Sequence, residues 1–125
     1  MLTDKKLKTF VSTTRPDKAK GFYGNILGLK LLSEDGYAME FDANGTRLRV
    51  TVVETLDPQP FTVLGWDVDE LPSLIISLTE KGVRFERYNS LLQDKLGIWT
   101  SPSGAKVVWF KDDDGNLLSL TEHPA

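Results

Sequence analysis

FKDDDGNLLSL, residues 110–120, joins two apolar, β-prone segments through an Asp-Gly pair. Tight hairpin turns need residues that tolerate positive φ, so Asp114-Gly115 is a strong local signal for a hairpin. We therefore expect strands at 105–110 and 117–121 to pair on either side of the turn. The acidic run 112–114 is interpreted as a solvated turn. A calcium loop with its glycine at Gly115 would need ligands from Phe110 and Thr121, and both fail as ligands.

The segments ahead of this hairpin predict the rest of the second half of the chain. Leu71, Leu74, Ile75 and Leu78 follow the i, i+3, i+4, i+7 spacing of a buried helical face. Gly82 ends this helix. The expected elements are a strand at 61–68, a helix at 70–81 and strands at 83–87 and 98–100.

The first half of the chain has the same plan. Its helix, ended by Gly28, lies between a strand at 7–14 and strands at 29–33, 37–42 and 46–54. The residues that follow the two helices share one pattern, in which the glycine is followed by an apolar, a basic and another apolar residue. The two segments are Gly28-Leu29-Lys30-Leu31 and Gly82-Val83-Arg84-Phe85. We interpret residues 1–125 as a single domain made of two βαβββ repeats, 5–54 and 61–122, with a linker at 56–60.

An α+β fold follows from this duplication. One unit alone leaves a sheet with a helix on one face and nothing on the other. We expect the two units to place their bare faces around a shared cup of mostly antiparallel strands, with the helices outside and a ligand pocket between the units. The alternative is a ferredoxin-like α+β domain whose second face only makes a subunit contact.

Composition narrows the classes of function. The formal net charge is −3 and no basic cluster offsets it, which argues against a nucleic-acid partner. No apolar run reaches the roughly 20 residues needed to cross a bilayer, and residues 1–6 lack the apolar core of a signal peptide. The chain has no cysteine, and its one histidine, His123, is interpreted as a tail residue without a chemical role. We expect a cytoplasmic protein with no membrane partner.

Several segments resemble the vicinal oxygen chelate superfamily, the group that holds glyoxalase I, extradiol dioxygenases and the fosfomycin and bleomycin resistance proteins. Residues 110–120 are similar to its signature F-x-D-P-D-G-N-x-x-E-L, with Asp113 in place of the proline and Ser119 in place of the glutamate. The resemblance spans residues 7–121 and implies the glyoxalase/bleomycin-resistance fold and a homodimer. The other segments that carry it are Phe22-Tyr23, Leu27-Gly28-Leu29, Trp66-Asp67-Val68-Asp69-Glu70-Leu71 and Lys81-Gly82-Val83.

The resemblance also implies where a metal would bind. Metal-binding members take His or Gln, Glu, His and Glu from the first strand of each unit and from the last strands. The matching positions here are Lys8 (or Thr9), Arg49, Val63 and Ser119. Divalent metals need imidazole or carboxylate donors, and two cations repel them. We therefore expect no metal, no cofactor and no metal-dependent lyase or dioxygenase activity.

Strand alternation predicts the ligand-binding residues. Phe10, Trp99 and Trp109 are expected to form an aromatic wall facing away from the helices, with Tyr37 as a further candidate. Polar anchors for a planar or apolar small molecule come from Ser12, Arg49 and Ser119. The alternative is that these aromatic residues pack in the core or at a dimer interface, as Trp66 is expected to pack in the core.

Three functions follow from these residues. The leading hypothesis is a metal-independent protein of the bleomycin-resistance type that binds a small aromatic or apolar molecule. The second is a lyase- or isomerase-type enzyme with non-metal chemistry, using Asp67 or Glu40 as a base and Arg49 or Lys8 to stabilise an enolate oxygen. The third is a dimeric, non-catalytic interaction module.

Overall fold

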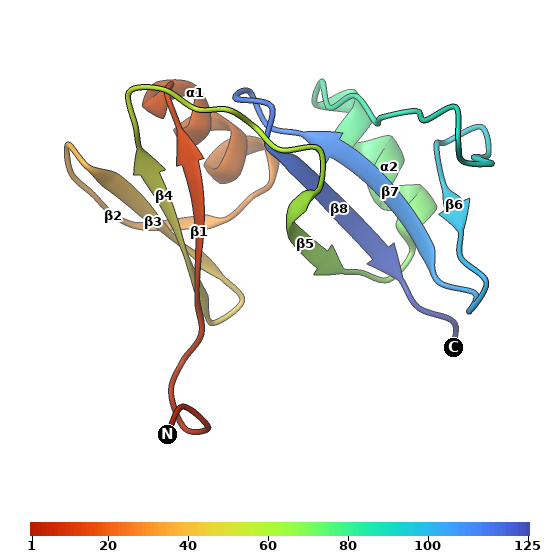
Figure 1. Cartoon of the computed structure of the whole chain (residues 1–125), viewed down its shortest axis with the longest axis horizontal. Coiled ribbons are helices and arrows are strands. Elements are labelled where there is room, and N and C mark those ends of the chain that lie inside the picture. Colours follow the sequence, from red (N-terminus) through yellow and green to blue (C-terminus); the bar gives the residue numbers. More distant parts are fainter. The chain divides into compact units, whose positions relative to one another are not determined.

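The structure is a computed structural model that describes residues 1–125, and it contains two compact units, 1–57 and 58–125 (Figure 1). Each unit has its own four-stranded sheet and its own helical segment. No helix in either unit combines the length and the apolar character that a bilayer crossing requires.

The first unit follows the order βαβββ. In its sheet the strands are ordered β1-β4-β3-β2; β1 is parallel to β4, and the other neighbours are antiparallel. The elements of this unit are β1 (Lys8–Thr13), α1 (Pro16–Lys20), the π-helical segment η1 (Gly21–Ile26), β2 (Lys30–Glu34), β3 (Ala38–Ala43) and β4 (Thr46–Val52).

The second unit repeats this plan. Its strand order is β5-β8-β7-β6, again with the first and last strands parallel and the remaining pairs antiparallel. The elements are β5 (Thr62–Asp67), α2 (Leu71–Glu80), β6 (Trp99–Thr100), β7 (Lys106–Lys111) and β8 (Leu117–Glu122). The shared strand order confirms the predicted α+β fold with two βαβββ modules.

The helical side of the first sheet is apolar. Phe41 and Leu48 are fully buried there, and the ring of Tyr23 in η1 lies 6.2 Å from that of Phe41. A fully buried Leu or Phe side chain stabilises the fold by roughly 1.5–3 kcal/mol. Because side chains alternate along a strand, the neighbours Glu40 and Arg49 face the opposite side of the sheet. Core packing on one face therefore fixes which residues lie on the other.

The first helix is not the single α-helix that the sequence pattern predicts. After Lys20 it widens into η1, where the Leu27 N–H donates to the Phe22 carbonyl at 2.9 Å, an i to i+5 bond. Gly21 and Gly24 lie in this segment, and each glycine disfavours an α-helix by about 1 kcal/mol relative to alanine. The helix was correctly placed, but its regularity was wrongly predicted.

Two further predictions for the second unit are wrong. Residues 83–87 form no strand, and Phe85 makes only an isolated bridge to Phe110. Trp66, expected in the core, is only half-buried. β5 pairs with β8 alone and lies at the edge of its sheet, and none of its residues is fully buried.

The predicted hairpin at 110–120 is confirmed. β7 and β8 are antiparallel, with Phe110 opposite Leu118. The expectation of a solvated acidic turn is wrong for Asp112, which is buried. Its carboxylate accepts hydrogen bonds from the backbone N–H groups of Asp114 at 3.0 Å and Asn116 at 2.9 Å, and from the Asn116 side-chain amide at 2.8 Å. The Asp112 carboxylate therefore stabilises the turn by accepting hydrogen bonds from its N–H groups.

Candidate functional site

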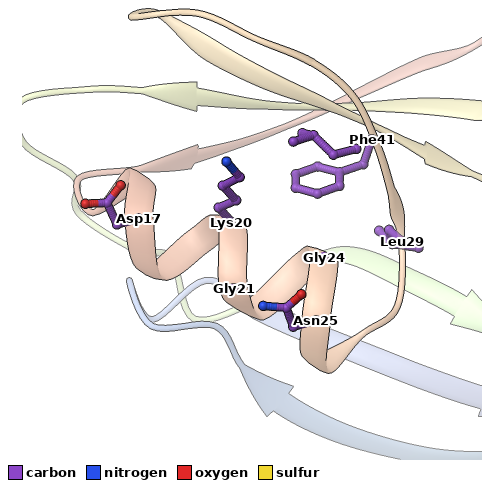
Figure 2. Close-up of a pocket in the computed structure, with 8 residues that line it drawn as sticks. Asp17, Lys20, Gly21, Gly24, Asn25, Leu29 and Phe41 are labelled. Atoms are coloured by element: carbon purple, nitrogen blue, oxygen red, sulfur yellow. The ribbon is translucent and has the colours of Figure 1, made fainter.

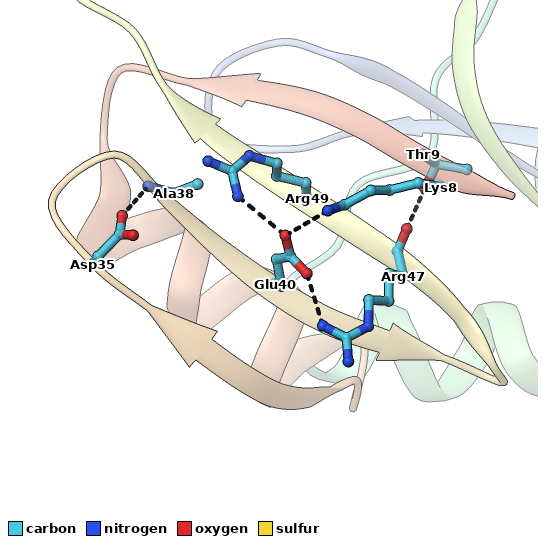
Figure 3. Close-up of polar contacts among 7 residues, drawn as sticks. All are labelled: Lys8, Thr9, Asp35, Ala38, Glu40, Arg47 and Arg49. Atoms are coloured by element: carbon cyan, nitrogen blue, oxygen red, sulfur yellow. Dashed lines mark hydrogen bonds and ion pairs between the residues drawn. The ribbon is translucent and has the colours of Figure 1, made fainter. Parts of the chain in front are cut away.

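A charged face, formed by Lys8, Glu40, Arg47 and Arg49, covers the side of the first sheet opposite the helices (Figure 3). The parallel pairing of β1 and β4 puts Lys8 opposite Arg47, and the antiparallel pairing of β3 and β4 puts Glu40 opposite Arg49. The sheet register thus brings residues from three strands to one place.

Glu40 is the centre of the charged face. Its Oε2 accepts from Lys8 Nζ at 2.8 Å and from Arg49 Nη1 at 3.0 Å, and its Oε1 accepts from Arg47 Nη1 at 3.1 Å. Only 7% of Glu40 is exposed to solvent. A buried carboxylate needs such partners, because an unpaired buried charge is strongly unfavourable.

These partners change the acidity of Glu40. The hydrogen bond from Lys8, followed by those from Arg47 and Arg49, lowers the pKa of Glu40 from 4.5 to about 2. Glu40 is therefore an anion at neutral pH and a weak proton acceptor. The geometry therefore does not favour Glu40 as a catalytic base, one of the two candidates that the sequence offered.

Three of the predicted ligand-binding residues share this side of the first sheet. Phe10 lies opposite Arg49 in the register of β1 and β4, and Ser12 lies opposite Thr51. The side chain of Phe10 is 60% exposed, an unusual position for a large apolar ring beside cations. Tyr37, the further candidate, lies in the turn before β3 and is exposed.

The other three predicted residues lie on one side of the second sheet. Trp99 and Trp109 have ring centroids 6.1 Å apart, and Trp109 makes an edge-to-face contact with Tyr88 at 5.7 Å. We call Tyr88, Trp99 and Trp109 the aromatic cluster. Ser119 lies opposite Trp109 in the register of β7 and β8. The three aromatic residues are partly exposed, whereas Ser119 beside them is buried.

Tyr88 was not among the residues predicted from the sequence. It lies in the loop between α2 and β6, which is held by the amide of Gln93. The Gln93 Oε1 accepts from the Tyr88 N–H at 2.8 Å, while its Nε2 donates to the carbonyls of Glu86 and Gly97 at 3.0 and 2.8 Å. Burial, with a smaller effect of Glu86, raises the pKa of the Tyr88 hydroxyl. No local pattern reveals this position, because it depends on a side-chain bond across the loop.

Ser119 depends on a close approach to β5. A Cβ atom added to Gly65 would lie only 2.7 Å from the Ser119 Oγ. The serine hydroxyl therefore occupies the space that any larger residue at position 65 would need.

The residues at the positions where the family takes its metal ligands do not fit a metal. Lys8 and Arg49 are cations held by Glu40, and Val63 and Ser119 carry an isopropyl and a hydroxymethyl group. Neither unit contains a group of three or more His, Cys, Asp or Glu side chains arranged to hold a metal ion. The donor chemistry at these positions disagrees with a divalent metal site.

Two cavities lie away from the predicted residues. One, of about 430 Å³, opens between the helical segment and the sheet of the first unit (Figure 2). It is lined by Asp17, Lys20, Asn25 and Phe41 among others, and Lys20 is already paired with Glu34 at 2.6 Å.

The second cavity, of about 260 Å³, lies beside the C-terminal residues, where His123 Nε2 lies 3.1 Å from Asp67 Oδ1. Asp67, the other candidate base, is thus partnered by the one histidine.

Both βαβββ units carry polar or aromatic residues on the side of the sheet away from the helix. This repeated unit defines a class of α+β proteins built by duplication. The chain belongs to the Glyoxalase/Bleomycin resistance protein/Dioxygenase superfamily, whose family model matches residues 7–120. The chain has no significant sequence match among curated proteins.

Solved structures are similar in fold. A superfamily member from Sphaerobacter thermophilus has a TM-score of 0.76 and 20% identity, covering 98% of this chain and 100% of that one. TnmS3, an antibiotic binding protein from a Streptomyces species, has a TM-score of 0.74 and 22% identity over 99% of both chains. A lactoylglutathione lyase from Agrobacterium tumefaciens has a TM-score of 0.73 and 17% identity, covering 98% of this chain and 96% of that one. At these identities the likeness establishes the fold.

Proposed function

We propose that this protein binds a small planar aromatic molecule without a metal ion. The observation that carries the proposal is the aromatic cluster, in which Trp109 lies between Tyr88 and Trp99 at ring distances of 5.7 and 6.1 Å. Partly exposed aromatic faces attract flat ligands, since each ring contact is worth about 0.5–1.5 kcal/mol beyond the buried area.

The surroundings of the cluster support this role. Ser119, opposite Trp109, supplies a hydroxyl that can donate or accept a hydrogen bond. In the first unit we propose Phe10, Ser12 and Arg49 as further ligand contacts, because they share the open side of their sheet. Sequestration requires shape, stacking and a few polar anchors, and it needs neither a base nor a metal.

The similarity to TnmS3 also supports a binding function, since that antibiotic binding protein has the same fold. The catalytic alternative receives less support, because a carboxylate with a pKa of about 2, as in Glu40, is a poor base. A homodimer, a cytoplasmic location and a single folded domain remain predictions that mass measurement and localisation would test.

Tryptophan fluorescence tests the proposal directly, because the chain has three tryptophans and two of them belong to the aromatic cluster. Titration with 2-naphthamide, a flat neutral probe, is expected to quench Trp109 emission saturably. Trp109→Leu should abolish the response. Trp66→Phe is the matched control, since Trp66 pairs with Leu120 on the other side of the sheet and should leave the affinity unchanged. Tryptophan fluorescence that does not change on titration with 2-naphthamide or with related fused-ring probes contradicts the proposal.

A further inference from the structure

We infer that the charged face selects aromatic ligands that carry a negative group, such as an aryl carboxylate, with the anion on Arg49 and the ring on Phe10. This inference rests on the part of the proposed function that makes Phe10 and Arg49 ligand contacts, and it deepens that function because it assigns the charge of the ligand.

Arg49 has hydrogen-bonding capacity left over. A guanidinium carries five N–H donors. Arg49 uses only an Nη1 donor for Glu40, and this nitrogen lies 3.0 Å from the Glu40 Oε2. Its side chain is 32% exposed, so part of it is open to a ligand. A planar carboxylate matches this fork, and such charge-assisted pairs are about twice as strong as neutral hydrogen bonds.

The charges on this face favour an anion. Lys8, Arg47 and Arg49 all converge on the single carboxylate of Glu40. Asp42 lies opposite Arg47 in the register but accepts from the Gly45 N–H at 2.7 Å, and it makes no ion pair with an arginine. Asp35, which Arg49 attracts electrostatically, accepts from the N–H groups of Tyr37 and Ala38. Three cations thus lie close to a single carboxylate, and a bound anion would neutralise part of the remaining positive charge.

Phe10 supplies the aromatic half of the recognition. It lies opposite Arg49 on the neighbouring strand, and the residue is 60% exposed. Neighbouring strands lie about 4.8 Å apart, so the side chains of these two paired residues leave the sheet at about that spacing. That spacing suits an aryl acid, whose ring and carboxylate are joined directly, better than a compact inorganic anion.

Glu40 prepares the site before any ligand arrives. Its bonds to Lys8 and Arg49 hold two flexible cationic side chains in place, at 2.8 and 3.0 Å. Holding such side chains in advance reduces the entropy lost on binding, which is about 0.5–1.5 kcal/mol per side chain. Glu40 therefore acts as a positioning residue.

The test compares 2-naphthoate with 2-naphthamide, two flat probes that differ in charge, in the full chain. We expect the wild type to bind 2-naphthoate about tenfold more tightly, with the preference shrinking at high salt. Arg49→Gln should abolish the preference, lowering the affinity for 2-naphthoate about tenfold more than the affinity for 2-naphthamide. Arg49→Lys, which keeps the charge, should retain part of it. Arg84→Gln removes an exposed arginine of the second unit and serves as the matched control.

The outcomes separate the two proposals. Equal affinity for both probes overturns the charge inference and leaves the proposed function intact. A charge preference that survives Arg49→Gln also overturns it. Binding of 2-naphthoate that is lost in Arg49→Gln but unaffected by Trp109→Leu supports the charge inference and contradicts the role of the aromatic cluster. If neither probe binds, both proposals fail. Circular dichroism of each variant verifies that it is folded.

Discussion

The hydroxyl of Ser119 fills the space beside Gly65 on the neighbouring strand, so that a Cβ atom at residue 65 would lie 2.7 Å from the Ser119 Oγ. Both residues lie on the side of the second sheet that carries Trp109. The pair therefore links the packing of an edge strand to the proposed ligand surface.

Gly65→Ala should destabilise the protein by about 1–3 kcal/mol in denaturant unfolding, because the added methyl group overpacks against the hydroxyl. The double variant Gly65→Ala/Ser119→Ala should recover part of this loss. Gly21→Ala is the matched control, since its φ of −66° is helical and no atom lies within 4 Å of an added Cβ. It should be neutral or stabilising. A neutral effect of Gly65→Ala would show that β5 shifts freely.

The ion pairs of Glu40 predict a pH-dependent contribution to stability. Its pKa falls from 4.5 to about 2 on folding, so the folded protein holds the anion more strongly than the unfolded chain does. The stabilisation should be complete above about pH 4.5 and should disappear as the pH falls toward 2. Comparing urea unfolding of the wild type and Glu40→Gln from pH 7 to pH 2 measures this. The stability difference should narrow only below about pH 4.5; a constant difference would contradict the assignment.

Gln93 is predicted to hold the loop that carries Tyr88. Gln93→Ala removes three hydrogen bonds and should cost about 1–3 kcal/mol, because the backbone groups it satisfied lose their partner. It should also weaken binding of 2-naphthamide by displacing Tyr88 from Trp109. Leu92→Ala in the same loop is the control, since Leu92 is 91% exposed; its effect should stay within about 0.5 kcal/mol. Unchanged hydrogen exchange of the Tyr88 amide in Gln93→Ala would argue against this role.

Asp112 is predicted to be the stability determinant of the hairpin at 110–120. Asp112→Ala leaves the N–H groups of Asp114 and Asn116 without their acceptor and should cost about 1–3 kcal/mol. Asp113→Ala, which removes an exposed carboxylate from the same turn, should change stability by less than about 0.5 kcal/mol. Thermal unfolding of the two variants measures the difference, and equal melting temperatures would contradict it.

Much of the fold was predictable because its signals are local. The helical face at Leu71, Leu74, Ile75 and Leu78 placed α2 to within one residue at each end, at 71–80. The Asp-Gly pair at 114–115 correctly predicted the β7–β8 hairpin. The strand at 83–87 was wrong because its apolar pattern satisfies a single bridge to Phe110 and no continuous pairing. The π-helical widening of η1 has no sequence signature beyond its two glycines.

The candidate site was predictable where strand alternation alone decides it. Alternation correctly separated Phe10 from Val11 and Trp109 from Phe110. The role of Glu40 was not predictable, because its three cationic partners come from β1 and β4, and only the register of the sheet brings them together. Tyr88 was missed for a similar reason, since Gln93 positions it across an irregular loop.

The shared strand order of the two sheets has a consequence for the diversity of this superfamily. The first unit presents ionic groups on the sheet side away from its helix and the second presents indole rings there, while the helix-facing side of each sheet is apolar. Residues at alternate strand positions can therefore diverge without disturbing the interior. Such a scaffold lets selection exchange one chemical specificity for another at little risk of misfolding.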